Sequence, residues 1–483
     1  MRTLALATLA LLSACATGPQ KPVAWPEDSA STQVKVLNRV TWGANRSSIA
    51  EISRLGTARF LGRQLEPQPE PQLPAGIQAR IDAMSISQRS ALDLATELEQ
   101  RRRAFQEMPA EERKAAQRAY QEELGRLARE AQSRMLLRAL YSPDQLKEQM
   151  TWFWMNHFSV FQFKFNLRAL VADYEESAIR PHALGRFREL LRASAHHPAM
   201  LIYLDNAQNA AGRVNENYAR ELLELHTLGV NGGYTQRDVQ ELARVLTGFS
   251  VNLVNAERRI RPVMLPYYRR DGLFEFIPGR HDFGDKELLG HTIRGRGPAE
   301  LDEALELLAR HPSTARFVSR KLAMHFVADE PPPALVERMA QAFLASDGDI
   351  AAVLREMFAS SEFRASLGGK FKDPLHYVVS ALRLALDERP LAETAPVIGA
   401  LALLGEPLYA RPTPDGYPLT RTDWSSPGQL ATRFDVARAM AERVPYKLAI
   451  EALGAATREA LAKAASVQEW NMLLLASPEF MQR

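Results

Sequence analysis

Three glutamates and one arginine lie close together on the chain, at Glu216, Arg220, Glu221 and Glu224. In a helix, residues four positions apart lie on one face, so Arg220 can pair with both Glu216 and Glu224. Glu221 is then left as the carboxylate without a cation. Such a carboxylate can act as a general base or bind a cation, while Arg220 stabilises negative charge. We therefore predict catalytic roles for Glu221, Arg220 and Glu224.

The same stretch also permits a purely structural interpretation. At about 100° per residue, one arc of the predicted helix is apolar and the opposite arc is polar. The apolar arc contains Tyr218, Ala219, Leu222, Leu223 and Leu225. Glu216 and Asn217 complete the polar arc and are candidates for binding a ligand, although a solvated face with ion pairs has the same pattern. His226 falls in the apolar arc, where we expect a core histidine.

An aromatic segment precedes this helix, with the sequence WFWMNHF over residues 152–158. Aromatic rings can stack on a sugar, and the neighbouring Asn156 and His157 could bond its hydroxyl groups. Aromatic residues at helical spacing are also typical of a protein core. We predict Asn156 and His157 as ligand-binding residues and keep the core interpretation as the alternative.

A third polar cluster, HDFGDK, covers residues 281–286. A histidine and an aspartate beside a glycine turn can supply nitrogen and oxygen ligands to a divalent metal. We predict a metal site formed by His157, His281 and Asp282, with Lys286 as a nearby ligand-binding cation. Alternatively, Asp282 orients His281 or caps the turn. The chain contains none of the HExxH, GxSxG, P-loop or Rossmann glycine patterns.

The N-terminus has the pattern of a bacterial lipoprotein. Residues 1–14 contain an early cation and a short apolar run, as in a signal peptide. They lead into LSAC, residues 12–15, which resembles the lipobox and predicts lipidation of Cys15. Two or more acyl chains there would anchor the protein stably to a membrane. Ala16 follows the cysteine, which is typical of an outer-membrane lipoprotein that faces the periplasm of a Gram-negative bacterium.

The composition excludes several classes of function. The formal net charge of the 483-residue chain is +3, which gives no sign of nucleic acid as a partner. Cys15 is the only cysteine, so the mature domain has neither an internal disulfide nor a thiol nucleophile.

Helical periodicity dominates the rest of the chain. Residues 15–32 are predicted to be a flexible tether, and residues 33–483 a mainly α, multi-helix globular bundle that forms one large domain. A charged helical hairpin is expected at about residues 86–141. Short alternating pieces with Gly and Pro predict a small β-hairpin insertion around residues 259–290.

Several stretches together resemble one bacterial family, the domain of unknown function 1800 family. They are VLNRVTWG, FWMNHF, HPAMLIYLDN, NENYARELLELHTLGVNGGYTQRDVQELARVLTGF, HDFGDKELLG, HPSTARFVSRKLAMHFV and LATRFDVA. The resemblance implies a large, exported, mostly helical protein with no established reaction. It also implies a companion, a sulfatase-like protein of the domain of unknown function 1501 family. The family pattern places these polar residues in its signature segments: Asn156, His157, Glu216, Asn217, Arg220, Glu221, Glu224, His281, Asp282 and Lys286.

Together these features predict a lipid-anchored envelope protein. It would bind, or help to process or assemble, an envelope or exported polymer or a partner protein. One alternative is a periplasmic metal-assisted hydrolase in which Glu221 is the base. The other is a non-catalytic scaffold or export factor for the sulfatase-like companion, in which the Glu/Arg helix is a structural ion-pair network.

Overall fold

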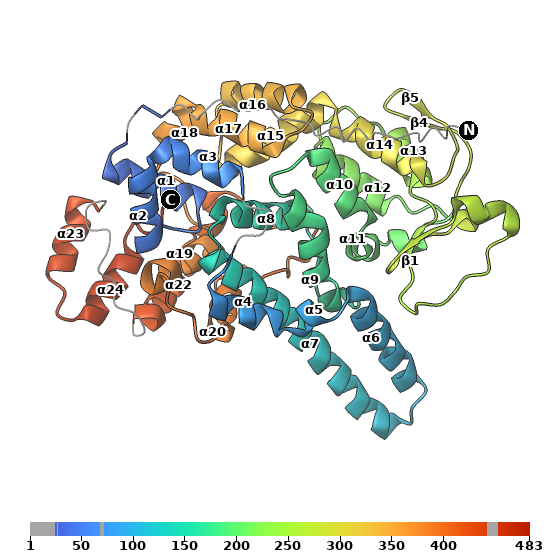
Figure 1. Ribbon diagram of the computed structural model, residues 1–483, viewed down its shortest axis with the longest axis horizontal. Helices are drawn as coiled ribbons and strands as arrows, with labels where there is room; N and C mark the ends of the chain where they lie inside the picture. The colour runs from blue at the N-terminus through green and yellow to red at the C-terminus, as the bar shows by residue number, and fades with distance from the viewer. Residues whose placement is uncertain (1–24, 27, 68–71, 442–452) are drawn as a thin grey trace, which may run out of the picture.

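The computed structural model describes residues 25–26, 28–67, 72–441 and 453–483. These residues form a mainly α-helical structure with two small sheets, which confirms the predicted fold class (Figure 1). The predicted signal peptide (residues 1–14), the lipidation site Cys15 and residues 16–24 of the tether lie outside the described residues. Within the described ranges, none of the helices combines the length and the apolar character needed to cross a membrane.

The first helix begins earlier than the sequence predicted. Helix α1 starts at Ala30, inside the segment assigned to the tether, because the Ser29 side chain accepts a hydrogen bond from the backbone N–H of Thr32 at 3.2 Å and caps the helix. Helices α1 and α3 of the N-terminal region contact the aromatic helix α8, and α2 packs against both α1 and α3. The helices of this region are α1 (Ala30–Val40), α2 (Arg46–Leu55), α3 (Thr57–Leu65), α4 (Ala75–Asp82), α5 (Ser85–Gln88) and α8 (Gln145–His157).

A hairpin of α6 (Ala91–Gln106) and α7 (Ala110–Tyr141) projects from the body at the bottom of Figure 1. Pro109 precedes the first residue of α7, where its missing N–H has no consequence for the helix. The tip of the hairpin is exposed, whereas the C-terminal half of α7 is largely buried in the body. The hairpin is therefore anchored at one end only.

The central region consists of short helical segments, several of which are 3-10 or π turns. Thr235 and Asp238 form a reciprocal capping box at the start of α13. The segments are η1 (Leu167–Ala169), α9 (Val171–Asp173), η2 (Tyr174–Ile179), η3 (Arg180–His182), α10 (Phe187–His196), α11 (Pro198–Tyr203), η4 (Asn206–Gln208), α12 (Asn217–Glu221), η5 (Leu222–Thr227) and α13 (Gln236–Val245).

The β insertion is larger than predicted and comprises two sheets. In the first sheet, β3 (Phe274–Phe276) pairs with both β1 (Phe249–Val251) and β2 (Arg269–Asp271). In the second, β4 (Lys286–Leu288) pairs with β5 (His291–Ile293). Leu289 and Gly290 join these two strands with positive φ angles of 51° and 77°, the geometry of a two-residue hairpin turn. The strands thus extend beyond residues 259–290, because β1 belongs to the first sheet although it precedes the insertion.

Helices continue to the C-terminus, and α14 to α18 form the upper edge of the molecule in Figure 1. Helix α19 is almost entirely buried, and the chain end returns beside α1, where Arg39 donates to the carbonyl of Arg483 at 2.6 Å. The 3-10 segments η6 (Pro262–Tyr267) and η7 (Pro278–Arg280) lie within the insertion. The later helices are α14 (Ala299–Ala309), α15 (Pro312–Phe326), α16 (Pro333–Ala345), α17 (Ile350–Ala359), α18 (Ser361–Ser366), α19 (Pro374–Leu386), α20 (Ala395–Leu403), α21 (Arg421–Trp424), α22 (Pro427–Ala441), α23 (Ala455–Ala462) and α24 (Val467–Ala476).

Candidate functional site

The Glu/Arg helix is formed by α12 and the π turn η5. Tyr218 and Leu222 are buried, but Leu225 is only partly buried, because the wider turn of η5 shifts the apolar arc and directs His226 into the core. The predicted core position of His226 is therefore correct, although a π turn rather than a regular α-helix produces it.

Arg220 makes the two ion pairs that its spacing predicted. It lies 3.1 Å from Glu216 and 3.8 Å from Glu224, and it also donates to the side chain of Gln236 at 3.0 Å. The side chains of Arg220, Glu216 and Glu224 keep 38%, 35% and 25% of their surface exposed. Ion pairs with this much solvent contact contribute little to stability. Of the two interpretations of this helix, the solvated face with ion pairs thus describes Glu216 and Arg220. Asn217 is exposed, and its side-chain amide donates to the carbonyl of Leu204 at 3.1 Å.

Glu221 differs from its two neighbours. Within the described part of the chain, its carboxylate makes neither a hydrogen bond nor an ion pair, and its side chain is partly buried. Burial raises the pKa of Glu221, the negative charges of Glu224 and Asp415 raise it further, and Arg220 opposes them. A partly buried carboxylate with a raised pKa and no partner is a candidate for proton transfer.

Lys321, on α15, is a second polar residue without a partner in the same region. Its Nζ lies 5.7 Å from the centroid of the Phe317 ring, and no carboxylate of the described residues comes within ion-pair distance. Burial lowers the pKa of Lys321 to about 8, and Asp415 opposes this shift. Asp415 is therefore within electrostatic reach of both Glu221 and Lys321. We call the side chains of Glu221, Glu224, Lys321 and Asp415 the Glu221–Lys321 site.

Asn156 holds the loop that carries Asp415. Its side-chain amide donates to the carbonyl of Tyr417 at 2.9 Å and accepts from the backbone N–H of Tyr417 at 2.6 Å. Gly416 has a φ of 78°, and a Cβ there would lie 2.1 Å from the carbonyl oxygen of Asn156, so the close approach requires glycine. Asn156 was predicted to bind a ligand, but its amide is engaged by the protein backbone. It positions the loop beside the site.

His157 lies beneath the site and is fully buried. Its Nε2 donates to the carbonyl of His226 at 3.1 Å, and Nδ1 has no hydrogen-bond partner among the described residues. Burial holds the pKa of His157 well below its usual range, and the positive charge of Lys321 and the neighbouring His226 lower it further. The ionisable groups that shift the pKa of His157 are thus a lysine and a second histidine, and they disfavour its charged form.

The aromatic segment around His157 belongs to the core. Trp154 is completely buried, and its Nε1 donates to the carbonyl of Ala183 at 2.9 Å. Its ring contacts those of Phe153, Phe158 and Phe187. These rings are therefore covered by protein and are not available to stack on a sugar.

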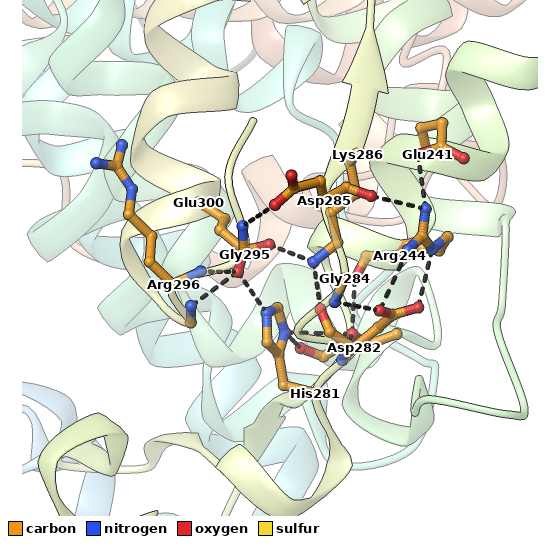
Figure 2. Close-up of polar contacts among 12 residues, drawn as sticks. Glu241, Arg244, His281, Asp282, Gly284, Asp285, Lys286, Gly295, Arg296 and Glu300 are labelled. Carbon is orange, nitrogen blue, oxygen red and sulfur yellow. Dashed lines mark hydrogen bonds and ion pairs between the residues drawn. The ribbon is translucent and has the colours of Figure 1, made fainter. Parts of the chain in front are cut away.

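His281 belongs to a different cluster, shown in Figure 2, which is buried and fully paired. Its Nε2 donates to a carboxylate oxygen of Glu300 at 2.9 Å, and its Nδ1 donates to the carbonyl of Thr247 at 2.7 Å. Lys286 binds the other carboxylate oxygen of Glu300. Glu300 also accepts from the backbone N–H groups of Arg296 and Gly297, both at 2.7 Å. The network joins the β4–β5 hairpin to the first turn of α14.

Asp282 faces the other side of the same turn. Its carboxylate oxygens accept from Arg244 of α13 at 2.8 and 3.2 Å, and from the backbone N–H of Gly284 at 2.9 Å. Arg244 in turn pairs with Glu241 at 2.8 Å. Asp282 thus caps its turn and connects it to α13, which was the structural alternative for this residue.

The predicted metal site is not assembled. His157 donates to His226, His281 is bound by Glu300 and Thr247, and Asp282 is bound by Arg244. The described residues contain no group of three or more His, Cys, Asp or Glu side chains that could hold a metal ion. The expectation failed because His157 lies in the aromatic core, whereas His281 and Asp282 are bound within the network that joins the β4–β5 hairpin to α13 and α14.

The sequence interpretation missed Glu300, Arg244, Lys321 and Asp415. Glu300 lies in the first turn of a helix after Gly297 and Pro298, a position where a carboxylate binds free backbone N–H groups. That pattern could have been noticed. Lys321 lies within the stretch HPSTARFVSRKLAMHFV, but nothing in the pattern of that stretch separates it from the neighbouring surface cations. Asp415 is in a loop that has no pattern of its own.

Comparison with known proteins identifies a family but not an activity. A family model described as "Protein of unknown function (DUF1800)" matches residues 35–482. No curated protein and no solved structure matches the chain. The matched region includes the Glu221–Lys321 site, the His281–Glu300 network and the aromatic helix. The chain therefore belongs to the DUF1800 family, as the resemblance of its motifs predicted.

Proposed function

We propose that this protein is a lipid-anchored envelope protein whose helical domain binds an exported or envelope polymer at the Glu221–Lys321 site. The observation that supports the site is the pair of side chains without partners. Glu221 and Lys321 come from separate helices, share Asp415 as an electrostatic neighbour, and form no ion pair within the described ranges. Structural charges in the same protein, such as Glu300 and Lys286, are paired.

The charges of the site indicate the chemistry of its ligand. Glu224 and Asp415 already pair with Arg220 and Arg411, so Glu221 is the carboxylate that favours an amine or a hydroxyl-rich group, whereas Lys321 favours a carboxylate or phosphate. A polymer that carries both kinds of group, as cell-wall and cell-surface polymers do, would satisfy both sides. The raised pKa of Glu221 and the lowered pKa of Lys321 also suit proton transfer. We therefore propose that the site can process the bound polymer chemically as well as bind it.

The lipid anchor rests on residues 1–16 and has its own test. Cys15→Ser is expected to release the protein from the membrane fraction, because the helical domain offers no membrane-spanning helix within its described residues. The measurement is fractionation of cells that produce the wild type or the variant, with metabolic labelling by a fatty acid. A variant that stays in the membrane fraction as firmly as the wild type would contradict the anchor.

The site is tested by polymer binding. We expect Glu221→Gln and Lys321→Met each to weaken binding of the full-length protein about 10- to 100-fold, since a hydrogen bond to a charged group contributes roughly 1.5–3 kcal/mol. Co-sedimentation with purified peptidoglycan and with isolated outer-membrane polysaccharide would measure this. Glu111→Gln, at the exposed start of α7, is the matched control and should bind as the wild type does.

Two results would contradict the polymer-binding proposal. One is wild-type protein that sediments with neither polymer. The other is variants that bind as tightly as the wild type. In the first case the sulfatase-like companion becomes the preferred ligand, in keeping with the charged α6–α7 hairpin that projects from the body (Figure 1). Co-purification with that companion would then test the scaffold alternative.

A further inference from the structure

A cavity of about 380 Å³ lies away from the Glu221–Lys321 site, between α1, α19 and the C-terminal residues. None of the site residues that the sequence predicted lines this cavity. Its lining includes Lys372, Ser380 and Asn38, aliphatic side chains such as Val34, Leu384 and Leu474, and the charged residues Lys35, Glu479 and Arg483. A cavity that combines apolar walls with a few polar groups is the usual arrangement of a small-molecule site.

Lys372 is buried without a counter-ion. Only 2% of its surface is exposed, its Nζ donates to Ser380 Oγ at 2.9 Å, and no carboxylate of the described residues lies within ion-pair distance. Lys370, two residues earlier and equally buried, pairs with Asp329. The Phe480 ring centroid lies 4.0 Å from Nζ of Lys372. Burial of a lysine with so few charged contacts favours the neutral amine.

Two neighbouring arginines act in the same direction as burial. Burial, Arg483 and Arg433 together lower the pKa of Lys372 to about 7, against the opposing charge of Asp373. At pH 7 and above, a large fraction of the amine therefore has a free lone pair and can accept a proton. A lysine of this kind next to a hydroxyl group is a recognised general base.

Ser380 is held rigidly in α19. Its hydroxyl group accepts from Lys372 and donates to the carbonyl of Tyr377 at 3.1 Å. Gly43 packs directly against it, because a Cβ built on Gly43 would lie 2.5 Å from Ser380 Cβ, and Gly43 has a φ of 126°. Only glycine permits both this backbone conformation and this approach. The glycine of the VLNRVTWG motif thus has a role at this cavity.

The same motif supplies a hydrogen-bond donor. Asn38 Oδ1 accepts from the backbone N–H of Ala44 at 2.9 Å, which orients the side chain. Its Nδ2 donates no hydrogen bond within the described parts of the chain, and the residue lines the cavity with Ser380. A nucleophile, a base and a fixed amide donor therefore share one cavity, which is the set of groups required for acyl transfer.

We propose that Ser380 and Lys372 form a nucleophile–base pair that takes an acyl group from a short-chain ester bound in this cavity. The Ser380 hydroxyl turns from Tyr377 toward Lys372, whose neutral amine accepts the proton as Oγ forms a bond to the carbonyl carbon. Asn38 Nδ2 donates to the carbonyl oxygen as it becomes negative. The ester C–O bond then breaks, and the Lys372 ammonium returns the proton to the departing alcohol. Water hydrolyses the acyl-serine by the same route.

The direct test is chemical labelling of the full-length, detergent-solubilised protein. An alkyl fluorophosphonate and p-nitrophenyl butyrate are the probes, and mass spectrometry of the digested protein locates the adduct. We expect a single major adduct, on Ser380. The rate should rise about tenfold per pH unit below the pKa of Lys372, about 7, and become constant above it.

Variants separate the roles of the two residues. Ser380→Ala should abolish the adduct, and Lys372→Arg should slow labelling at least about 100-fold, since arginine keeps the charge but cannot act as a base. Ser319→Ala, at a buried serine of α15, is the control and should label as the wild type does. A wild type without an adduct on Ser380, or Lys372→Arg that labels at the wild-type rate, would overturn the proposal. The wild-type result is decisive even if a variant fails to fold.

Discussion

Replacement of Glu300 by alanine is expected to lower the free energy of unfolding by roughly 3–5 kcal/mol. Glu300 is completely buried and binds both Lys286, which is also completely buried, and His281. The substitution leaves the Lys286 ammonium in the interior without a counter-charge, and two backbone N–H groups at the start of α14 lose their acceptor. Urea denaturation followed by circular dichroism would measure the loss.

The matched control is an exposed ion pair in the same hairpin. Asp285 pairs with Arg294, and both side chains are largely exposed. Asp285→Ala should therefore change the free energy of unfolding by no more than about 0.5 kcal/mol. If Asp285→Ala and Glu300→Ala lowered the free energy of unfolding equally, the buried network would contribute no more to stability than an exposed ion pair.

The same network predicts how stability depends on pH. Burial alone would raise the pKa of Glu300, but the hydrogen bonds from His281 and Lys286 and the charge of His281 outweigh burial and lower it. A carboxyl group with a lowered pKa in the folded state contributes stability above its unfolded pKa, and this contribution is lost as the pH falls through the folded value. Glu300→Gln, which cannot ionise, should therefore lose less stability than the wild type on acidification below about pH 4.3.

Trp154→Ala is expected to lower the free energy of unfolding by a similarly large amount, roughly 3–5 kcal/mol. The Trp154 ring is completely buried, and the substitution leaves a cavity among Phe153, Phe158 and Phe187. It also leaves the carbonyl of Ala183 without its indole donor. Denaturant unfolding of the variant and the wild type measures this difference.

Phe163 offers a control from the same aromatic region. Its side chain is 55% exposed, and its contacts are the Phe161 ring and the guanidinium of Arg168. Phe163→Ala should lower the free energy of unfolding by less than about 1 kcal/mol. If both variants lost the same stability, or if Trp154→Ala changed ligand binding but not stability, the core interpretation of the aromatic helix would be wrong.

These predictions assign structural roles to several motif residues that resembled ligands of a catalytic site. Asn156 binds the backbone of Tyr417, His281 binds Glu300, and Asp282 binds Arg244. A polar residue in a family motif therefore does not have to touch a substrate. In this protein such residues hold loops and hairpins in place, whereas Glu221, Lys321 and Asn38 Nδ2 make no hydrogen bond or ion pair within the described residues.

Local features of the fold were predictable from the sequence because their cause lies within one or two helical turns. The helical class follows from periodicity and composition, and the Thr235–Asp238 capping box follows from a spacing of three residues. The spacing of four residues predicted that Arg220 pairs with Glu216 and Glu224. The same rule left Glu221 as the carboxylate without a partner.

The tertiary structure alone decided which motif residues meet. Asn156 reaches Tyr417, His281 reaches Glu300, and Gly43 packs on Ser380, over sequence separations that no periodic pattern spans. It also decided how much of the Glu/Arg arc remains in water and, through the π turn over Leu222–Thr227, that His226 points into the core. Sequence periodicity determines which face of an element is apolar. The partner of a polar side chain depends on how distant elements pack, and therefore on the whole set of core contacts at once.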